Sequence, residues 1–240
     1  MHTANPILNR GAFSDARSYD WSTGMTIQGT ANKTLALLFI CFLTASWVWS
    51  NPLTLMPLFW PALISGFILA IVTVFKKDWA PVTAPFYAAV EGVILGTISA
   101  FFERAYPGVV IQAVGLTFGT MFALLAVYKA GVIKVTDNFR IGLFAATGSI
   151  ALYYLLSIIL NIFGITVPLI HSTGIFGIGF SLFVVIIAAL NLVLDFDMIE
   201  KASYMGAPKY MEWYGAFGLM VTLIWLYIEI LRLLSKLRNR

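Results

Sequence analysis

Charged side chains are scarce in this chain of 240 residues, and over one long stretch they are missing. Only 11% of the residues are Asp, Glu, Lys or Arg, whereas about a quarter are charged in an ordinary soluble domain. None of the four occurs between Ile141 and Leu194. About 20 apolar residues, rising 1.5 Å each, cross a hydrocarbon layer of about 30 Å, so this run is long enough for two crossings. A soluble fold is excluded, and a membrane protein is indicated.

The residue types that usually build catalytic and metal sites are also few. Cys41 is the single cysteine, which excludes an intramolecular disulfide and a multi-cysteine metal site. The two histidines, His2 and His171, lie outside the apolar stretches, and the sequence has no HExxH metal motif. We find no nucleophile and base pattern and no phosphate-binding loop. The sequence therefore predicts neither an enzyme nor a bound cofactor.

Apolar residues, 60% of the chain, gather in seven stretches. Each is long enough for one membrane crossing. We predict an all-α membrane protein, a bundle of seven transmembrane helices at about 34–50, 54–75, 82–102, 109–128, 141–164, 174–194 and 209–235. The predicted organisation is a polar N-terminal segment over 1–33, one membrane domain over 34–235 and a basic tail over 236–240.

Lysine and arginine predict the orientation, because loops that stay in the cytoplasm are enriched in both. With the N-terminus inside, the outer loops hold only Arg104. The inner segments hold Arg10, Arg17, Lys33, Lys76, Lys77, Lys129, Lys134, Arg140, Lys201 and Lys209. We therefore expect a cytoplasmic N-terminus, with 76–81, 129–140 and 195–208 on the same side. Seven crossings place the basic tail outside, so either the rule fails there or one stretch is re-entrant; we favour seven crossings.

Carboxylates within the apolar stretches are the candidates for function, because a charge at the centre of a membrane helix costs about 2.5–3.5 kcal/mol on insertion scales. Glu91 lies well inside the third stretch and must face other helices or a cavity; the alternative role is a neutral structural carboxyl. Asp195 and Asp197 stand where the sixth stretch ends. Two residues apart on a helix, they point to different faces, so at most one points inward. The alternative for both is a solvated helix end.

Glu229 lies late in the last stretch, three residues before Arg232. One interpretation is a local ion pair between these two side chains. The other is contact with a second acid, in which case the two carboxyls titrate as a unit and form a proton-sensitive latch. In the ionised state such a pair would also offer oxygen ligands to calcium.

Small residues mark two helix faces suited to close packing. Gly92 and Gly96 are one such pair, beside Glu91, and Gly115 and Gly119 are another on the fourth stretch. We expect both pairs to lie at helix contacts.

Several short motifs resemble one known family. The sixth stretch runs into Phe196-Asp197-Met198-Ile199-Glu200-Lys201, and the last contains Leu226-Tyr227-Ile228-Glu229. Asn5-Pro6, the segment Met25 to Thr34, and Ala89-Val90-Glu91-Gly92 with Leu95-Gly96 add to these. In this order they resemble the prokaryotic branch of the Bax inhibitor-1 family, over nearly the whole chain.

The resemblance implies a seven-helix bundle whose last helix is central, in the bacterial cytoplasmic membrane. It also implies a pH-sensitive calcium leak gated by paired acids on the last two helices, here Asp197 and Glu229, which could hold calcium transiently. Calcium would be the permeant ion and protons would regulate its passage; the partners would be the bilayer, calcium and protons. Bacterial relatives are linked to a membrane-bound protease, so a non-conducting protein that regulates such a client is the alternative function.

The spacing of the two acids differs from the family pattern. An alignment on Arg232-Leu233-Leu234 places the family's last-helix aspartate on Thr222. Glu229 is then two turns further along, about 10 Å higher at 1.5 Å per residue. We therefore expect that Asp197 and Glu229 do not touch, with Glu91 as an alternative partner for Glu229.

Overall fold

The computed structural model describes residues 24–164 and 174–239, which form a bundle of helices without any strand in those ranges. Its elements are α2 (Ile27–Ser50), α3 (Pro52–Leu55), η3 (Met56–Leu58), α4 (Phe59–Phe75), η4 (Lys77–Trp79), α5 (Ala80–Ala105), α6 (Val109–Lys129), α7 (Asp137–Ile162), α9 (Ile175–Tyr204) and α10 (Met211–Arg238). Seven stretches of these ranges are long and apolar enough to cross a membrane, with α3 to α4 and η4 to α5 counted as one each. The predicted fold class is confirmed. His2, Asn5-Pro6, Arg10, Arg17, His171 and Arg240 lie outside the described residues.

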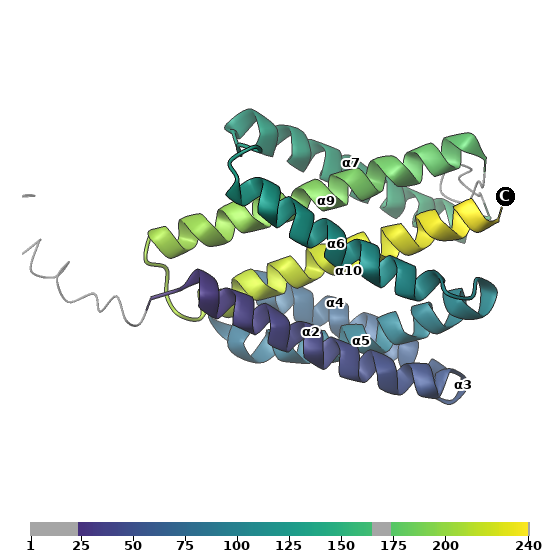
Figure 1. Ribbon diagram of the computed structural model, residues 1–240. Helices are drawn as coiled ribbons and strands as arrows, with labels where there is room; N and C mark the ends of the chain where they lie inside the picture. The colour runs from purple at the N-terminus through teal and green to yellow at the C-terminus, as the bar shows by residue number, and fades with distance from the viewer. Residues whose placement is uncertain (1–23, 165–173, 240) are drawn as a thin grey trace, which may run out of the picture.

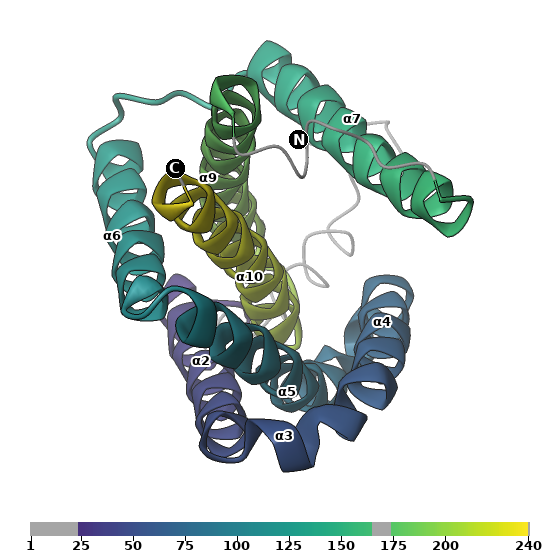
Figure 2. The same ribbon diagram turned by 90° about the vertical axis from the view of Figure 1, so that its right-hand side faces the viewer.

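The last helix is the centre of the bundle. α10 contacts α2, α5, α6 and α9, and the other helices surround it (Figure 2). Its buried face includes Leu219, Leu223, Leu226 and Ile230, which pack in the main apolar core. α7 lies at the edge, against α9, and α4 lies at another edge, against α5. The expected central position of the last helix is therefore present.

The bundle has two ends, which we name after residues of α10. α2 and α10 both begin at one end, where Glu212 lies, and α10 finishes at the opposite end, near Arg238 (Figure 1). We call these the Glu212 end and the Arg238 end. Because the long helices alternate in direction, the connections 76–79, 130–136 and 205–210 are all at the Glu212 end. The three segments that the sequence predicts on one side of the membrane thus share one end.

Two predicted helix boundaries are wrong. α9 continues to Tyr204 instead of ending near residue 194, and α2 begins at Ile27 instead of near residue 34. Charged residues suggested a helix end at 194, but Asp197, Glu200 and Lys201 form ion pairs in the bundle and the helix continues. α2 begins early because the Thr26 side chain caps it, accepting a hydrogen bond of 2.9 Å from the Gly29 amide.

The two glycine pairs have different surroundings. A Cβ on Gly96 would lie 2.6 Å from the carbonyl oxygen of Ala45 in α2, so α2 and α5 touch here at backbone distance. Gly92 has a similar environment, against Cys41 and Thr44. Gly115 has nothing within 4 Å of such a Cβ. The expected close contact is confirmed for the first pair, whereas Gly115 and Gly119 of α6 are at no helix contact in the described chain.

Candidate functional site

Polar side chains recur at intervals of seven residues on two helices of the bundle. α7 carries them at positions 140, 147 and 154, and α10 at positions 222, 229 and 236. Seven residues make about two helical turns, so each set lies on one face. With polar residues of α9 between them, they form what we call the polar seam: Arg140, Thr147, Tyr154, Ser181, Asn191, Asp195, Asp197, Lys201, Thr222, Glu229, Arg232 and Lys236.

Asp197 lies at the Glu212 end of the polar seam and is held by two cations. It forms an ion pair with Arg140 of α7, and its Oδ1 lies 2.8 Å from the Nζ of Lys201, one turn along α9. Its side chain is only 10% exposed. A buried carboxylate needs such partners to offset the cost of leaving water. The ion pair with Arg140 also joins the start of α7 to α9.

Asp195 has a different environment, although it lies only two residues away. Its carboxyl faces the hydroxyl of Thr222 on α10. Its Oδ2 is buried and has no hydrogen-bond partner in the described ranges, and no lysine or arginine there forms an ion pair with it. Thr222 is the position where the family alignment placed the last-helix acid, so a hydroxyl that faces Asp195 stands there instead.

An amide joins α9 and α7 in the middle of the polar seam. The Nδ2 of Asn191 donates hydrogen bonds to the Oγ1 of Thr147 at 2.9 Å and to the carbonyl of Ile187 at 2.8 Å. Thr147 is halfway between Arg140 and Tyr154 on α7. The polar seam therefore continues through the apolar middle of the bundle.

Glu229 lies at the Arg238 end of the polar seam and is almost fully buried. Its Oε1 accepts hydrogen bonds of 3.0 Å from the hydroxyl of Tyr154 and 3.0 Å from Arg232. Arg232 also donates to the Tyr154 hydroxyl at 2.7 Å. One turn further, the buried Lys236 donates to Ser181 at 2.9 Å and to the Gly177 carbonyl at 3.1 Å. The local ion pair of Glu229 with Arg232 is thus present.

The sequence prediction that Asp197 and Glu229 do not touch is confirmed, since each has its own cation partners at opposite ends of the seam. The latch made of these two acids, which the resemblance implied, is therefore not formed. Glu91 does not replace it: a Cβ on Gly66 of α4 would lie 3.5 Å from the Glu91 Oε1, so this acid faces α4. No hydrogen bond in the described structure joins Glu91 to Glu229. Within residues 24–164 and 174–239, no three His, Cys, Asp or Glu side chains gather as metal ligands.

Sequence reasoning missed a second polar cluster, which is centred on Glu212. This side chain is fully buried and forms ion pairs with Lys33 and with Lys209, the latter at 2.8 Å. It also accepts hydrogen bonds from the Thr26 amide at 2.9 Å and the Thr26 hydroxyl at 2.8 Å. The Met25 amide donates to the Ala207 carbonyl at 2.7 Å. These contacts clamp the start of α2 to the start of α10; the N-cap residue Thr26 was the one local signal.

Comparison with known proteins gives one result for the whole chain. The family model described as Bax inhibitor 1 like matches residues 5–239. A search of curated proteins finds no match.

Proposed function

The chain belongs to the Bax inhibitor 1 like family, and from this premise we propose that it lets calcium leak down its gradient through the membrane, under the control of protons on intramembrane carboxylates. The polar seam is the observation that supports this function. Ionisable groups inside membrane spans are expensive and typically mark ion paths. Here ionisable groups lie toward both ends of the seam, and the neutral side chains of Thr147 and Asn191 lie between them.

Only a few positions along the polar seam offer the oxygen ligands that a hard cation needs. Calcium takes oxygen ligands from carboxylates, hydroxyls and amides. Asp195 with Thr222 offers such oxygens, and so does Thr147 in the middle. Cations flank them on both sides, Arg140 and Lys201 at one end and Arg232 and Lys236 at the other. These charges repel calcium at the entrances, so we expect a slow leak rather than the flux of an open channel.

Protons control the leak by competing with calcium for Asp195. The buried Oδ2 of Asp195 lacks a partner, and a proton or a cation each supplies one. A protonated Asp195 carries no charge and attracts calcium less. Asp197 acts through its charge, because it offsets Arg140 and Lys201 beside Asp195. Competition between protons and calcium for Asp195 reduces calcium flux as the pH falls.

The test is calcium flux into liposomes that contain the purified protein, measured across about pH 5–8. The parent should pass calcium faster at the higher pH. Asp195→Asn should lower the flux and flatten the pH profile, because it removes a titrating oxygen with little change in size. Asp78→Asn, an exposed acid at the Glu212 end, is the matched control and should leave the profile unchanged.

Asp197→Asn and Glu229→Gln extend the test along the polar seam. If calcium passes along the seam, each variant should alter the pH profile of the flux. Glu91→Gln, which changes an acid outside the seam, is the comparison. If Asp195→Asn and Asp197→Asn both keep the parent's profile, acid gating is wrong. Flux against a calcium gradient, driven by protons, would instead indicate a transporter.

If the parent passes no calcium at any pH, the calcium leak is wrong and a non-conducting regulator of a membrane-bound protease becomes the better function. In either case we propose a bacterial cytoplasmic membrane location with the N-terminus in the cytoplasm, no enzyme activity and no resident cofactor. The charge bias of the loops supports the orientation.

A further inference from the structure

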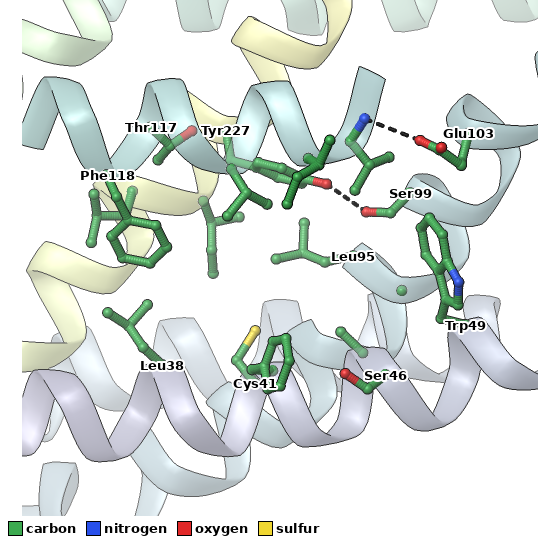
Figure 3. A pocket seen from close by; sticks show the side chains of 18 of the residues that line it. Leu38, Cys41, Ser46, Trp49, Leu95, Ser99, Glu103, Thr117, Phe118 and Tyr227 are labelled. Carbon is green, nitrogen blue, oxygen red and sulfur yellow. Dashed lines mark hydrogen bonds between the residues drawn. The ribbon is translucent and has the colours of Figure 1, made fainter. Parts of the chain in front are cut away.

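A cavity of about 570 Å³ lies outside the polar seam, between α2 and α6. Residues of α5 and α10, among them Ser99 and Tyr227, complete its lining (Figure 3). Most of its wall is apolar, with Leu38, Phe118 and Leu223 among the lining residues. The cavity is within the membrane-crossing part of the bundle, so lipid hydrocarbon surrounds it.

Four polar side chains of this cavity, Ser99, Tyr227, Thr117 and Glu103, have hydrogen-bond partners within the protein. The hydroxyls of Ser99 and Tyr227 lie 2.7 Å apart and bond each other, as Figure 3 shows. The Thr117 hydroxyl donates to the Ala113 carbonyl of its own helix at 2.8 Å. Glu103 accepts hydrogen bonds from the amides of Gly108 and Val110, at 2.5 and 3.2 Å, and so caps α6. The cavity therefore suits an occupant with an apolar body, because most of its lining is apolar.

A second cavity of about 280 Å³ adjoins the first at the Arg238 end of the bundle. Trp49 and Glu103 line both cavities, and Arg104 lines the second one. Arg104 is exposed and has no salt bridge within the described ranges. The nearby carboxylate of Glu103 accepts hydrogen bonds from backbone amides at the start of α6 and forms no ion pair with Arg104. Arg104 thus offers a guanidinium for an anion at the mouth of an apolar cavity.

We propose that the two adjoining cavities form a binding site for an anionic glycerophospholipid. One acyl chain fills the larger cavity, whose volume is within the range of about 300–1,000 Å³ for ligand sites. The phosphate lies in the smaller cavity against Arg104, because arginine pairs well with phosphate oxygens. Trp49 lies between the two, at the level where tryptophan is enriched in membrane proteins. Charge complementarity selects an anionic headgroup over a zwitterionic one.

The test uses native mass spectrometry of the purified full chain with added phosphatidylglycerol or phosphatidylcholine of identical acyl chains. The parent should retain one phosphatidylglycerol under conditions that remove phosphatidylcholine. Val114→Trp fills the larger cavity and should weaken retention about tenfold, since it displaces several methylene groups. Leu116→Trp, on the lipid-facing side of the same helix, is the matched control and should behave as the parent.

Arg104→Gln should remove the preference for phosphatidylglycerol, while Lys76→Gln at the opposite end should keep it. Should Val114→Trp fail to fold, Ser46→Phe fills the same cavity from α2. Equal retention by the cavity-filling variant and by Leu116→Trp would overturn the acyl-chain site. An unchanged headgroup preference in Arg104→Gln, or no lipid retained by the parent, would overturn the proposal as well.

Discussion

The buried carboxylates of this protein differ in how many cationic side chains offset their charge. Those with cation partners stabilise the fold, whereas one without such a partner is free to bind an ion. Glu212 has two lysines and Asp197 has an arginine and a lysine. Glu229 has Arg232. Asp195 has a threonine and a buried oxygen without a partner in the described chain. A charge without a partner is the least stable of these arrangements, so Asp195 is the acid most suited to bind and release an ion.

Glu212→Gln tests the structural group. The variant keeps the size of the side chain but loses the charge that offsets Lys33 and Lys209. Hydrogen bonds to charged groups contribute about 1.5–3 kcal/mol, and the half-exposed Lys209 lowers this, so we expect a loss of about 2 kcal/mol. Thermal unfolding in detergent measures it. Asp78→Asn should unfold as the parent does, and the same behaviour in Glu212→Gln would show that the clamp contributes nothing.

The number of membrane-spanning helices was predictable from the sequence, whereas the contacts between helices and the helix ends that depend on them were less predictable. The seven apolar stretches correspond to seven membrane-spanning helices, because a helix surrounded by lipid must consist mostly of apolar residues. The end of α9 was not predictable, since one of the two cations that offset the Asp197 charge is Arg140, on another helix. The Glu212 clamp joins residues that are far apart in the chain, and its one local signal, the N-cap residue Thr26, does not identify Glu212 as the partner. Spacing did predict the separation of Asp197 from Glu229, because it depends on helix geometry alone.

Gly96→Ala and Gly115→Ala form a matched pair at the scale of helices. A methyl on Gly96 would press on the backbone of Ala45 and force α2 and α5 apart, which we expect to cost about 1–3 kcal/mol. A methyl on Gly115 meets open space, and alanine favours the helix by about 1 kcal/mol. Thermal unfolding should therefore order the proteins as Gly115→Ala, parent, Gly96→Ala. Equal stability of the two variants would contradict the close contact.

Across the whole molecule, the two ends use their basic residues differently. Loops at the Glu212 end carry exposed lysines such as Lys76 and Lys134. At the Arg238 end, Arg232 and Lys236 are engaged in the polar seam, and Arg238 donates to the Pro107 carbonyl. The basic tail is thus largely used within the bundle. The predicted topology places this tail outside, and these contacts offset the preference of positive charge for the cytoplasmic side.

Cysteine labelling tests the orientation, in a Cys41→Ser background. A membrane-impermeant maleimide added to intact cells should label Ala105→Cys, at the Arg238 end, and should leave Ala130→Cys unlabelled. Permeabilised cells should show labelling of both, because both positions are exposed. Labelling of Ala130→Cys in intact cells would reverse the predicted topology.

The central claim is that ions pass along the polar seam, and blocking its midpoint tests this most directly. Thr147→Cys places a thiol beside Asn191, in the middle of the seam, and Ser149→Cys places one on the exposed side of the same helix. Both are made in Cys41→Ser, reconstituted into liposomes and treated with a small thiol reagent before calcium flux is measured. The account predicts that modification lowers the flux through Thr147→Cys and leaves Ser149→Cys unchanged. Full flux through a completely modified Thr147→Cys protein would contradict it.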